Sequence, residues 1–166
     1  MTNPQPAIGE ATETDLDGIL APQAANQVAR GGTLSAELPR ARIEAMMGDM
    51  PLVVARGEQG VLGFLMSTTR AMNADFPIIR AMFAAYPGSA DAYVYGPICV
   101  AASERGKGLA QALFQELRRL QPGREGILFI RRDNEASIRA HLRMGMREVA
   151  GFEMNGVAFS VMSFIG

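Results

Sequence analysis

The clearest hydrophobic pattern in this chain is a leucine stripe. Leucine recurs at positions 109, 113, 117 and 120, at intervals of four, four and three, and Gln and Arg residues stand between them. This spacing predicts an amphipathic helix over 109–120 that turns its leucines toward a core. Pro122-Gly123 follows at once and predicts where the helix ends.

Shorter apolar runs predict strands. The runs 52–56 and 61–68 are separated by Glu58-Gln59-Gly60, which indicates a hairpin. Asn155-Gly156 indicates a second hairpin between 146–151 and 157–165. The runs 93–101 and 126–130 lie on either side of the leucine helix. We therefore expect them to be parallel, with a right-handed crossover between them.

Other segments have weaker signals. A first strand is expected over 8–12, and Asp15 can cap a helix that reaches about residue 28, although Pro22 must break or kink it. A second helix, capped by Thr33 or Ser35, should end near residue 47. Pro39 fits only in its first turn, unless the helix begins there. Segment 71–86 has helical spacing that Pro77 interrupts, and Asn134 can cap a helix that ends near Gly145.

This order of elements predicts an α/β (α+β) fold, with a mixed sheet flanked by helices. We expect one domain over 7–166, preceded by a loose, proline-containing tail over 1–6. A polar ligand should bind at the carboxyl end of the strand over 93–101.

Composition narrows the classes of function. Sixteen basic and 17 acidic residues give a formal charge of -1, which offers no field for nucleic acid or an anionic membrane. One cysteine, Cys99, excludes an internal disulfide, and one histidine with one cysteine is too few for a four-ligand zinc site, so no metal is expected. The N-terminus does not read as a signal peptide, and we expect a cytoplasmic protein.

The loop before the leucine helix carries the strongest candidate chemistry. It reads Arg105-Gly106-Lys107-Gly108-Leu109-Ala110. Glycines lack a Cβ and let a ligand approach the backbone closely. Amides at the start of a helix have no internal partner and lie at the positive end of its dipole. This loop is therefore predicted to hold a phosphate group.

Three patches of the sequence resemble the GCN5-related N-acetyltransferase (GNAT) superfamily. Arg105-x-x-Gly108-x-Ala110 is similar to its acetyl-coenzyme A signature. Asn134 to Ile138, followed by His141 and Met144-Gly145-Met146, is similar to its Asn-aromatic-Gly-Phe segment. Ile8 to Ala11 with Asp15 is similar to its opening strand and helix start. The resemblance implies a mostly antiparallel central sheet with a splayed parallel pair.

The resemblance also implies a binding mode for acetyl-coenzyme A as acyl donor. The amides of Gly106, Lys107, Gly108, Leu109 and Ala110 would hold the pyrophosphate, with Arg105 as a helper and Asn134 as a further contact. The backbone of Ile98, Cys99 and Val100 would pair with the pantetheine arm, and an amide of Ile98 or Cys99 would polarise the acetyl carbonyl. Gly96-Pro97 either opens a slot for the cofactor or is a simple edge-strand proline. Cys99 is expected to be an inert packing residue.

His141 departs from the family pattern, because many members carry a tyrosine there that is assigned to protonating the leaving thiolate. On a helical wheel His141 points inward. We interpret it either as a catalytic proton donor or relay, or as a hydrogen-bonded core imidazole. The general base is open between Glu10, Glu37, Tyr93, Tyr95 and water.

The predicted function is transfer of acetyl from acetyl-coenzyme A to a primary amine, with a small molecule as acceptor. Two alternatives stay open: a protein or peptide N-acetyltransferase, and a non-catalytic acyl-coenzyme A sensor of the same fold. The segment 71–88 is longer than usual in the family. Its Met and Phe residues could form a flap over the acceptor, a homodimer interface or core.

Overall fold

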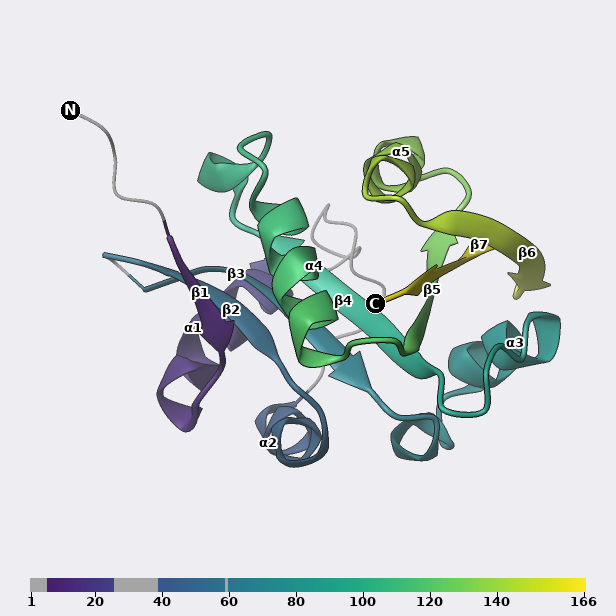
Figure 1. The fold of residues 1–166 in the computed structure, drawn as a ribbon, viewed down its shortest axis with the longest axis horizontal. Helices are drawn as coiled ribbons and strands as arrows, with labels where there is room; N and C mark the ends of the chain where they lie inside the picture. Colours follow the sequence, from purple (N-terminus) through teal and green to yellow (C-terminus); the bar gives the residue numbers. More distant parts are fainter. Residues whose placement is uncertain (1–5, 26–38, 59) are drawn as a thin grey trace. The chain divides into compact units, whose positions relative to one another are not determined.

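A seven-stranded mixed sheet runs through the described part of the chain, residues 6–25, 39–58 and 60–166 of the computed structural model (Figure 1). Neighbouring strands are hydrogen-bonded in the order β1-β2-β3-β4-β5-β7-β6. The strands are β1 (Ala7–Glu10), β2 (Val53–Gly57), β3 (Gly60–Thr68), β4 (Tyr93–Val100), β5 (Glu125–Arg131), β6 (Arg147–Met154) and β7 (Val157–Ile165).

Five α-helices lie among the described residues. They are α1 (Leu16–Ala25), α2 (Arg40–Asp49), α3 (Pro77–Ala85), α4 (Leu109–Leu120) and α5 (Glu135–Arg143). Pro39 is extended and immediately precedes α2, and Pro77 occupies the first turn of α3, where a missing amide proton costs nothing. None of these helices has the length and apolar character needed to cross a bilayer.

The strand directions confirm the predicted fold class. Strands β4 and β5 are parallel, with Tyr93 opposite Gly126 and Val94 opposite Ile127. The hairpins β2–β3 and β6–β7 are antiparallel, as are the pairs β1–β2 and β5–β7. Asn155 and Gly156 have φ of 51° and 79°, the left-handed values that a tight hairpin turn requires.

The chain divides into two compact units, and the division falls inside β4. The first unit contains residues up to Ser67 together with Gly96–Leu120, and the second contains Thr68–Tyr95 and Gln121–Gly166. The expectation of one domain over 7–166 stays a prediction, as does the slot at Gly96-Pro97. Most of the expected tail over 1–6 lies outside the described residues.

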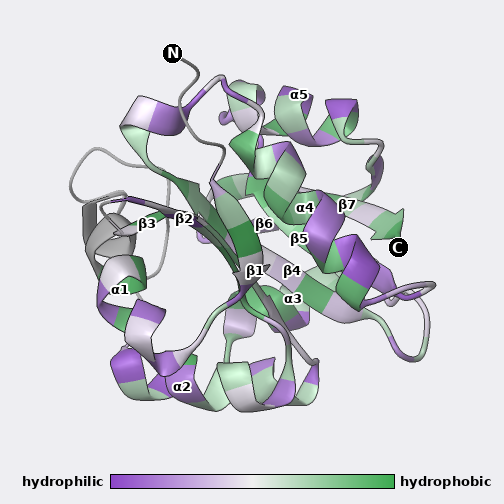
Figure 2. Cartoon of the chain, turned by 60° about the vertical axis from the view of Figure 1, so that its left-hand side comes forward, coloured by the Kyte–Doolittle hydropathy of each residue, from purple (hydrophilic) through white to green (hydrophobic). Residues whose placement is uncertain are grey.

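The core of the first unit forms where α4 packs against β1 and β2. Leu109, Leu113 and Leu117 of the predicted stripe are buried, together with Phe114. Figure 2 shows the resulting bands of hydrophobic and hydrophilic residues along α4. Gly63 of β3 lies beneath this helix, and a Cβ added there would stand 2.9 Å from the carbonyl oxygen of Cys99.

The start of α1 differs from the prediction that Asp15 caps it. Asp15 instead ends a short 3-10 turn, Glu13–Asp15, that begins after Thr12 and runs directly into α1. Its carboxylate accepts a hydrogen bond from the Thr12 amide at 2.8 Å. It also accepts two from the Arg56 guanidinium, at 2.9 and 2.7 Å. The carboxylate thus holds the turn that contains its own residue and ties that turn to β2.

Other predicted boundaries of this unit have mixed outcomes. Helix α1 continues past Pro22 to Ala25, so the proline does not end it there. The end predicted near residue 28 lies outside the described residues, and so do the proposed caps Thr33 and Ser35.

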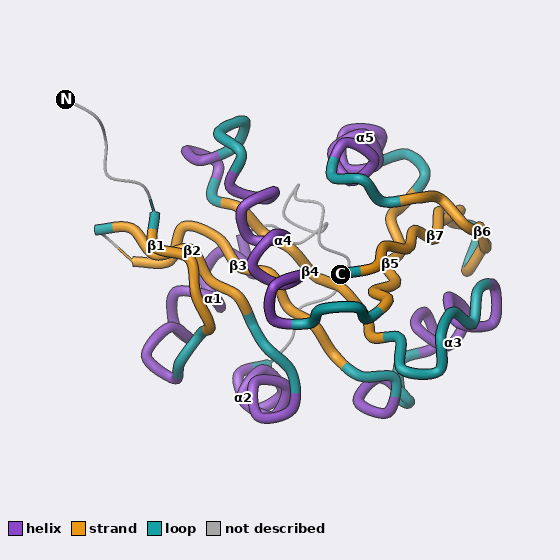
Figure 3. Tube along the Cα trace, in the orientation of Figure 1, coloured by secondary structure: helices purple, strands orange, loops and turns teal. Residues whose placement is uncertain are grey.

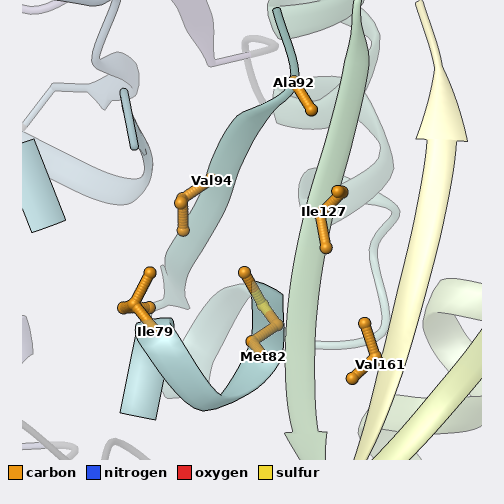
Figure 4. Packing of buried hydrophobic residues seen from close by; sticks show 6 residues of the cluster. All are labelled: Ile79, Met82, Ala92, Val94, Ile127 and Val161. Carbon is orange, nitrogen blue, oxygen red and sulfur yellow. The ribbon is translucent and has the colours of Figure 1, made fainter. Parts of the chain in front are cut away.

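The core of the second unit brings α3 onto β4, β5 and β7. Figure 4 shows Ile79 and Met82 of α3 facing Val94, Ile127 and Val161. Ala92 completes this cluster of buried residues. The apolar residues of 71–88 therefore belong to the core on at least one face of α3. The flap and the dimer interface stay predictions.

A buried carboxylate that the sequence did not reveal fixes the loop after α3. Glu125 accepts hydrogen bonds from the Ser89 amide at 2.6 Å, the Ser89 hydroxyl at 2.9 Å and the Tyr86 hydroxyl at 2.8 Å. The Ser163 hydroxyl donates a further bond to it. These donors outweigh the opposing effect of burial and leave the pKa of Glu125 below its usual value.

Candidate functional site

The glycine loop connects β4 to α4 in the first unit. A short 3-10 turn, Ala102–Glu104, follows β4, and α4 begins directly after Gly108 (Figure 3). Gly106 and Gly108 have φ of 78° and 81°, in the left-handed region, and Lys107 between them does not. Alternation of this kind turns successive amides toward one side of a loop, where an anion can bind.

The amides that follow this loop are not used by the helix itself. The first backbone hydrogen bond of α4 runs from the Ala112 amide to the Gly108 carbonyl, at 3.1 Å. The amides of Leu109, Ala110 and Gln111 precede that bond. They lie at the positive end of a 12-residue helix, where a phosphate is stabilised by both the donors and the dipole.

The space around the two glycines fits a bulky anion. A Cβ added at Gly106 or Gly108 would meet no atom within 4 Å. The loop is therefore open on the side where a side chain would stand. Arg105 and Lys107 are exposed beside it, and the Lys107 ammonium lies 3.7 Å from the Glu104 carboxylate. The loop is thus open and left-handed at both glycines, and its binding of a pyrophosphate stays a prediction.

The strand segment that leads into the loop alternates in burial. Cys99 is buried, and Ile98 and Val100 on either side are partly exposed. Burial raises the pKa of the Cys99 thiol to about 11, an effect that Arg105 only partly offsets. At neutral pH the thiol stays protonated, which agrees with the predicted packing role.

Asn134 and His141 lie on α5, in the second unit. The Asn134 side chain accepts a hydrogen bond from the Ser137 amide at 3.3 Å, so the predicted N-cap is confirmed. Met144 forms the C-cap and Gly145 follows with a φ of 95°, as predicted for the end of this helix.

His141 points inward and is buried, as the helical wheel predicts. Its Nδ1 lies 2.7 Å from the Ser137 carbonyl oxygen, and its Nε2 lies 3.1 Å from the Tyr95 hydroxyl oxygen. The Tyr95 and His141 rings meet edge to face, with centroids 5.5 Å apart. Burial lowers the pKa of His141, opposed by the bond to Ser137. The imidazole is therefore neutral at pH 7.

The predicted site residues form two groups. Ile98, Cys99 and Val100 and the loop from Arg105 to Ala110 are contiguous in the first unit, and Asn134 and His141 share one helix of the second. Of the base candidates, Tyr95 contacts His141, while Glu10 is exposed at the end of β1. Glu37 lies outside the described residues. The Tyr95–His141 contact had no signal in the sequence, because 46 residues separate the partners.

A family model, described as the acetyltransferase (GNAT) family, matches residues 32–146. The chain belongs to this family. The matched range contains the glycine loop, the N-cap of α5 and His141, so the three features occur together as the GNAT resemblance implies. Comparison of the sequence with curated proteins found no match.

Solved structures with the GNAT fold superpose on nearly the whole chain. A phosphinothricin acetyltransferase from Sinorhizobium meliloti, in complex with AcCoA, has a TM-score of 0.71 at 21% identity and covers 98% of this chain and 89% of its own. Ard1 from Thermoplasma volcanium has 0.72 at 17%, covering 98% of each. The ribosomal-protein-S18-alanine N-acetyltransferase from Escherichia coli has 0.67 at 13%, covering 96% and 93%. At these identities the likeness shows the fold.

Proposed function

We propose that this GNAT protein transfers the acetyl group of acetyl-coenzyme A to a primary amine of a small molecule. The observation that carries the proposal is the open, left-handed glycine loop at the N-terminus of α4. An overall charge of -1 leaves local backbone donors as the means of binding a diphosphate. The AcCoA complex of the S. meliloti phosphinothricin acetyltransferase supports this choice of donor.

The reaction needs few side chains. The amine nitrogen attacks the thioester carbon, and the carbonyl oxygen gains negative charge that the amide of Ile98 or Cys99 would stabilise. The tetrahedral intermediate then expels coenzyme A as a thiolate, which takes up a proton while the nitrogen loses one. Holding the amine and the thioester in line supplies much of the acceleration. The Cys99 side chain takes no part, since its thiol stays protonated.

The resemblance assigns His141 to the position where many family members carry a tyrosine, and we propose that it carries a proton during the reaction. Its burial and its contact with Tyr95 support a role within a defined hydrogen-bonded pair. Asn134 is proposed to contact the cofactor as well as to cap α5.

A second class of acceptor is also a candidate. The similar structures include a phosphinothricin acetyltransferase and a ribosomal-protein-alanine N-acetyltransferase with TM-scores of 0.71 and 0.67, so a protein N-terminus is the second candidate acceptor. The near-neutral charge of the chain favours the small molecule, because it gives no net field that would attract a charged peptide tail.

Release of free thiol from acetyl-coenzyme A tests the proposal. The amines would be amino acids, phosphinothricin, polyamines, aminoglycosides, and peptides with an N-terminal alanine. Turnover with a small amine supports the proposal. Turnover with the peptides alone would instead identify a protein N-terminus as the acceptor. Thermal stabilisation by acetyl-coenzyme A without thiol release from any amine would instead identify a sensor.

Two glycine substitutions test whether the glycine loop before α4 binds acetyl-coenzyme A. Gly108→Ala should raise the Kd for acetyl-coenzyme A about tenfold or more, because a methyl group would enter the anion's space and φ would move off its left-handed value. Gly123→Ala is the matched control. Gly123 also has a left-handed φ, 74°, and open space, but it follows α4 instead of preceding it. Equal weakening by both variants, measured by calorimetric titration, would contradict the assignment of the loop.

A further inference from the structure

The hydrogen bonds around His141 fix which of its nitrogens carries the proton. The Ser137 carbonyl oxygen, 2.7 Å from Nδ1, can only accept, so Nδ1 donates to it. In a neutral ring the other nitrogen is then an acceptor. Nε2 therefore accepts from the Tyr95 hydroxyl, 3.1 Å away. This chain of bonds runs in one direction, from Tyr95 through His141 to Ser137.

We propose that Tyr95 and His141 form a proton relay that works in one direction. The Tyr95 oxygen accepts a proton from the substrate. Nε2 of His141 is unprotonated at rest and therefore has no proton to donate. The inference rests on the proposed acetyl transfer and adds Tyr95 to its machinery. It reverses the role that the family's tyrosine has at this position. The relay would serve the loss of a proton by the attacking nitrogen, and not the protonation of the thiolate.

Each step of the relay balances. A proton leaves the positively charged nitrogen of the tetrahedral intermediate and forms a bond to the Tyr95 oxygen. The Tyr95 O–H bond breaks as an Nε2–H bond forms, which leaves His141 as an imidazolium whose Nδ1 still donates to Ser137. The Tyr95 hydroxyl itself stays neutral, as it must, because burial raises its pKa well above the usual value. After the amide product leaves, Nε2 returns its proton to the Tyr95 oxygen as that oxygen releases its own proton to a solvent water molecule, which restores the resting pair.

The surroundings of the pair favour this resting state. Both rings are buried, with 4% of each residue exposed. Burial also lowers the pKa of His141 and keeps the lone pair of Nε2 unprotonated. The edge of one ring meets the face of the other, and Tyr95 packs against Phe164 as well, so the hydroxyl is held in place. The geometry provides a positioned acceptor instead of a positioned acid.

The sequence makes the first experiment unusually direct. His141 is the one histidine of the 166 residues, so an imidazole ¹⁵N spectrum of the full chain reports it without assignment work. At pH 7 the relay predicts a pyrrole-type Nδ1 and a pyridine-type Nε2. In Tyr95→Phe, Nε2 should shift toward the value of a nitrogen without a hydrogen-bond donor, while Nδ1 keeps its proton.

Tyr93→Phe is the matched control for this spectrum. Tyr93 lies two residues earlier on the same strand and its ring also meets Phe164 edge to face, at 6.0 Å. Removing its hydroxyl should leave both His141 nitrogens unmoved. A wild-type spectrum with the proton on Nε2, or an imidazolium at pH 7, would overturn the relay. An unchanged spectrum in Tyr95→Phe would also overturn it.

A double-mutant cycle tests whether the pair acts in the reaction. Tyr95→Phe and His141→Gln should each lower kcat about tenfold or more with little change in the KM for acetyl-coenzyme A, and the double variant should be no slower than the slower single variant. Additive losses, or no loss in Tyr95→Phe, would overturn the role in catalysis. If no amine is acetylated but the ¹⁵N spectra are as predicted, the proposed function fails and the hydrogen-bond direction stands.

Discussion

Asp15 and Arg56 form a bidentate ion pair in the first unit. The two hydrogen bonds from Arg56 hold the pKa of Asp15 below its usual value of 3.8. The carboxylate is 8% exposed and the guanidinium 36%, so solvent screens the pair in part. Arg56 also donates to the Glu10 carbonyl at 2.8 Å, which links β2 to the end of β1.

This pair predicts a pH-dependent stability. Because folding lowers the pKa of Asp15, the stabilisation is present in full above pH 4 and is lost as the pH falls through the lowered pKa. Asp15→Asn should reduce the free energy of unfolding by about 1 kcal/mol at pH 7, and by less at pH 3. Urea unfolding of both proteins at the two pH values measures the difference. A gap of the same size at pH 3 would contradict the assignment.

At the residue scale, the sequence predicted the chemical state and direction of side chains better than their hydrogen-bond partners. The inertness of Cys99 and the inward direction of His141 followed from apolar neighbours and helical spacing. The partner of His141 did not, because contacts between residues 46 positions apart depend on how β4 and α5 are brought together. Glu125 was missed for the same reason, since its four hydrogen bonds come from Tyr86 and Ser89, between α3 and β4, and from Ser163 of β7.

At the scale of elements, the N-terminus of α5 is capped by a side chain, Asn134, that is also a candidate cofactor contact. Asn134→Ala should destabilise the protein by about 1 kcal/mol, because the Ser137 amide loses its acceptor. Asn134→Asp keeps a capping oxygen and adds a charge suited to a helix start, so stability should be retained. Thermal unfolding of the two variants measures the cap.

The same two variants separate capping from binding. If Asn134 contacts acetyl-coenzyme A, Asn134→Asp should weaken binding severalfold at unchanged stability, since it loses the amide donor and introduces charge near an anionic ligand. Full binding by Asn134→Asp would remove Asn134 from the cofactor site and leave it as a cap.

Strand β5 has a glycine that its neighbour requires. A Cβ added at Gly126 would collide with the ring of Phe164, which lies opposite it on β7. Gly126→Ala should therefore cost about 2 kcal/mol through overpacking. Gly48→Ala is the control. Gly48 lies in α2, and a Cβ added there would meet no atom within 4 Å, so alanine should stabilise the helix by about 0.5–1 kcal/mol. If Gly126→Ala were as stable as the natural protein in urea, the packing of Phe164 on β5 would be wrong.

The elements themselves were largely readable, because their signals are local. The leucine stripe predicted α4, although the helix begins at Leu109 and leaves Arg105 to Gly108 in the loop, and Asn155-Gly156 predicted the last hairpin. The start of α1 was mispredicted, since either Thr12 or Asp15 is a suitable cap and only the contact with Arg56 decides between them. Such competition between adjacent residues is settled by tertiary contacts.

At the scale of the whole molecule, membership of the GNAT family and the order of the seven strands among the described residues agree with the order of elements read from the sequence. The acceptor is not encoded by these features, because the same fold serves small-molecule and protein acetyltransferases. The resemblance to the family assigns the acyl donor to the loop before α4. The proposed function therefore depends most on that loop binding acetyl-coenzyme A.

The most direct test is a titration of ¹⁵N-labelled protein with acetyl-coenzyme A, followed through the backbone amides of Gly106 to Gln111. We predict that these amides shift and saturate together, and that the Gly123 and Gly156 amides, in turns with the same left-handed φ, stay unmoved. If the amides of Gly106 to Gln111 do not move at a saturating concentration of acetyl-coenzyme A, the central claim is contradicted.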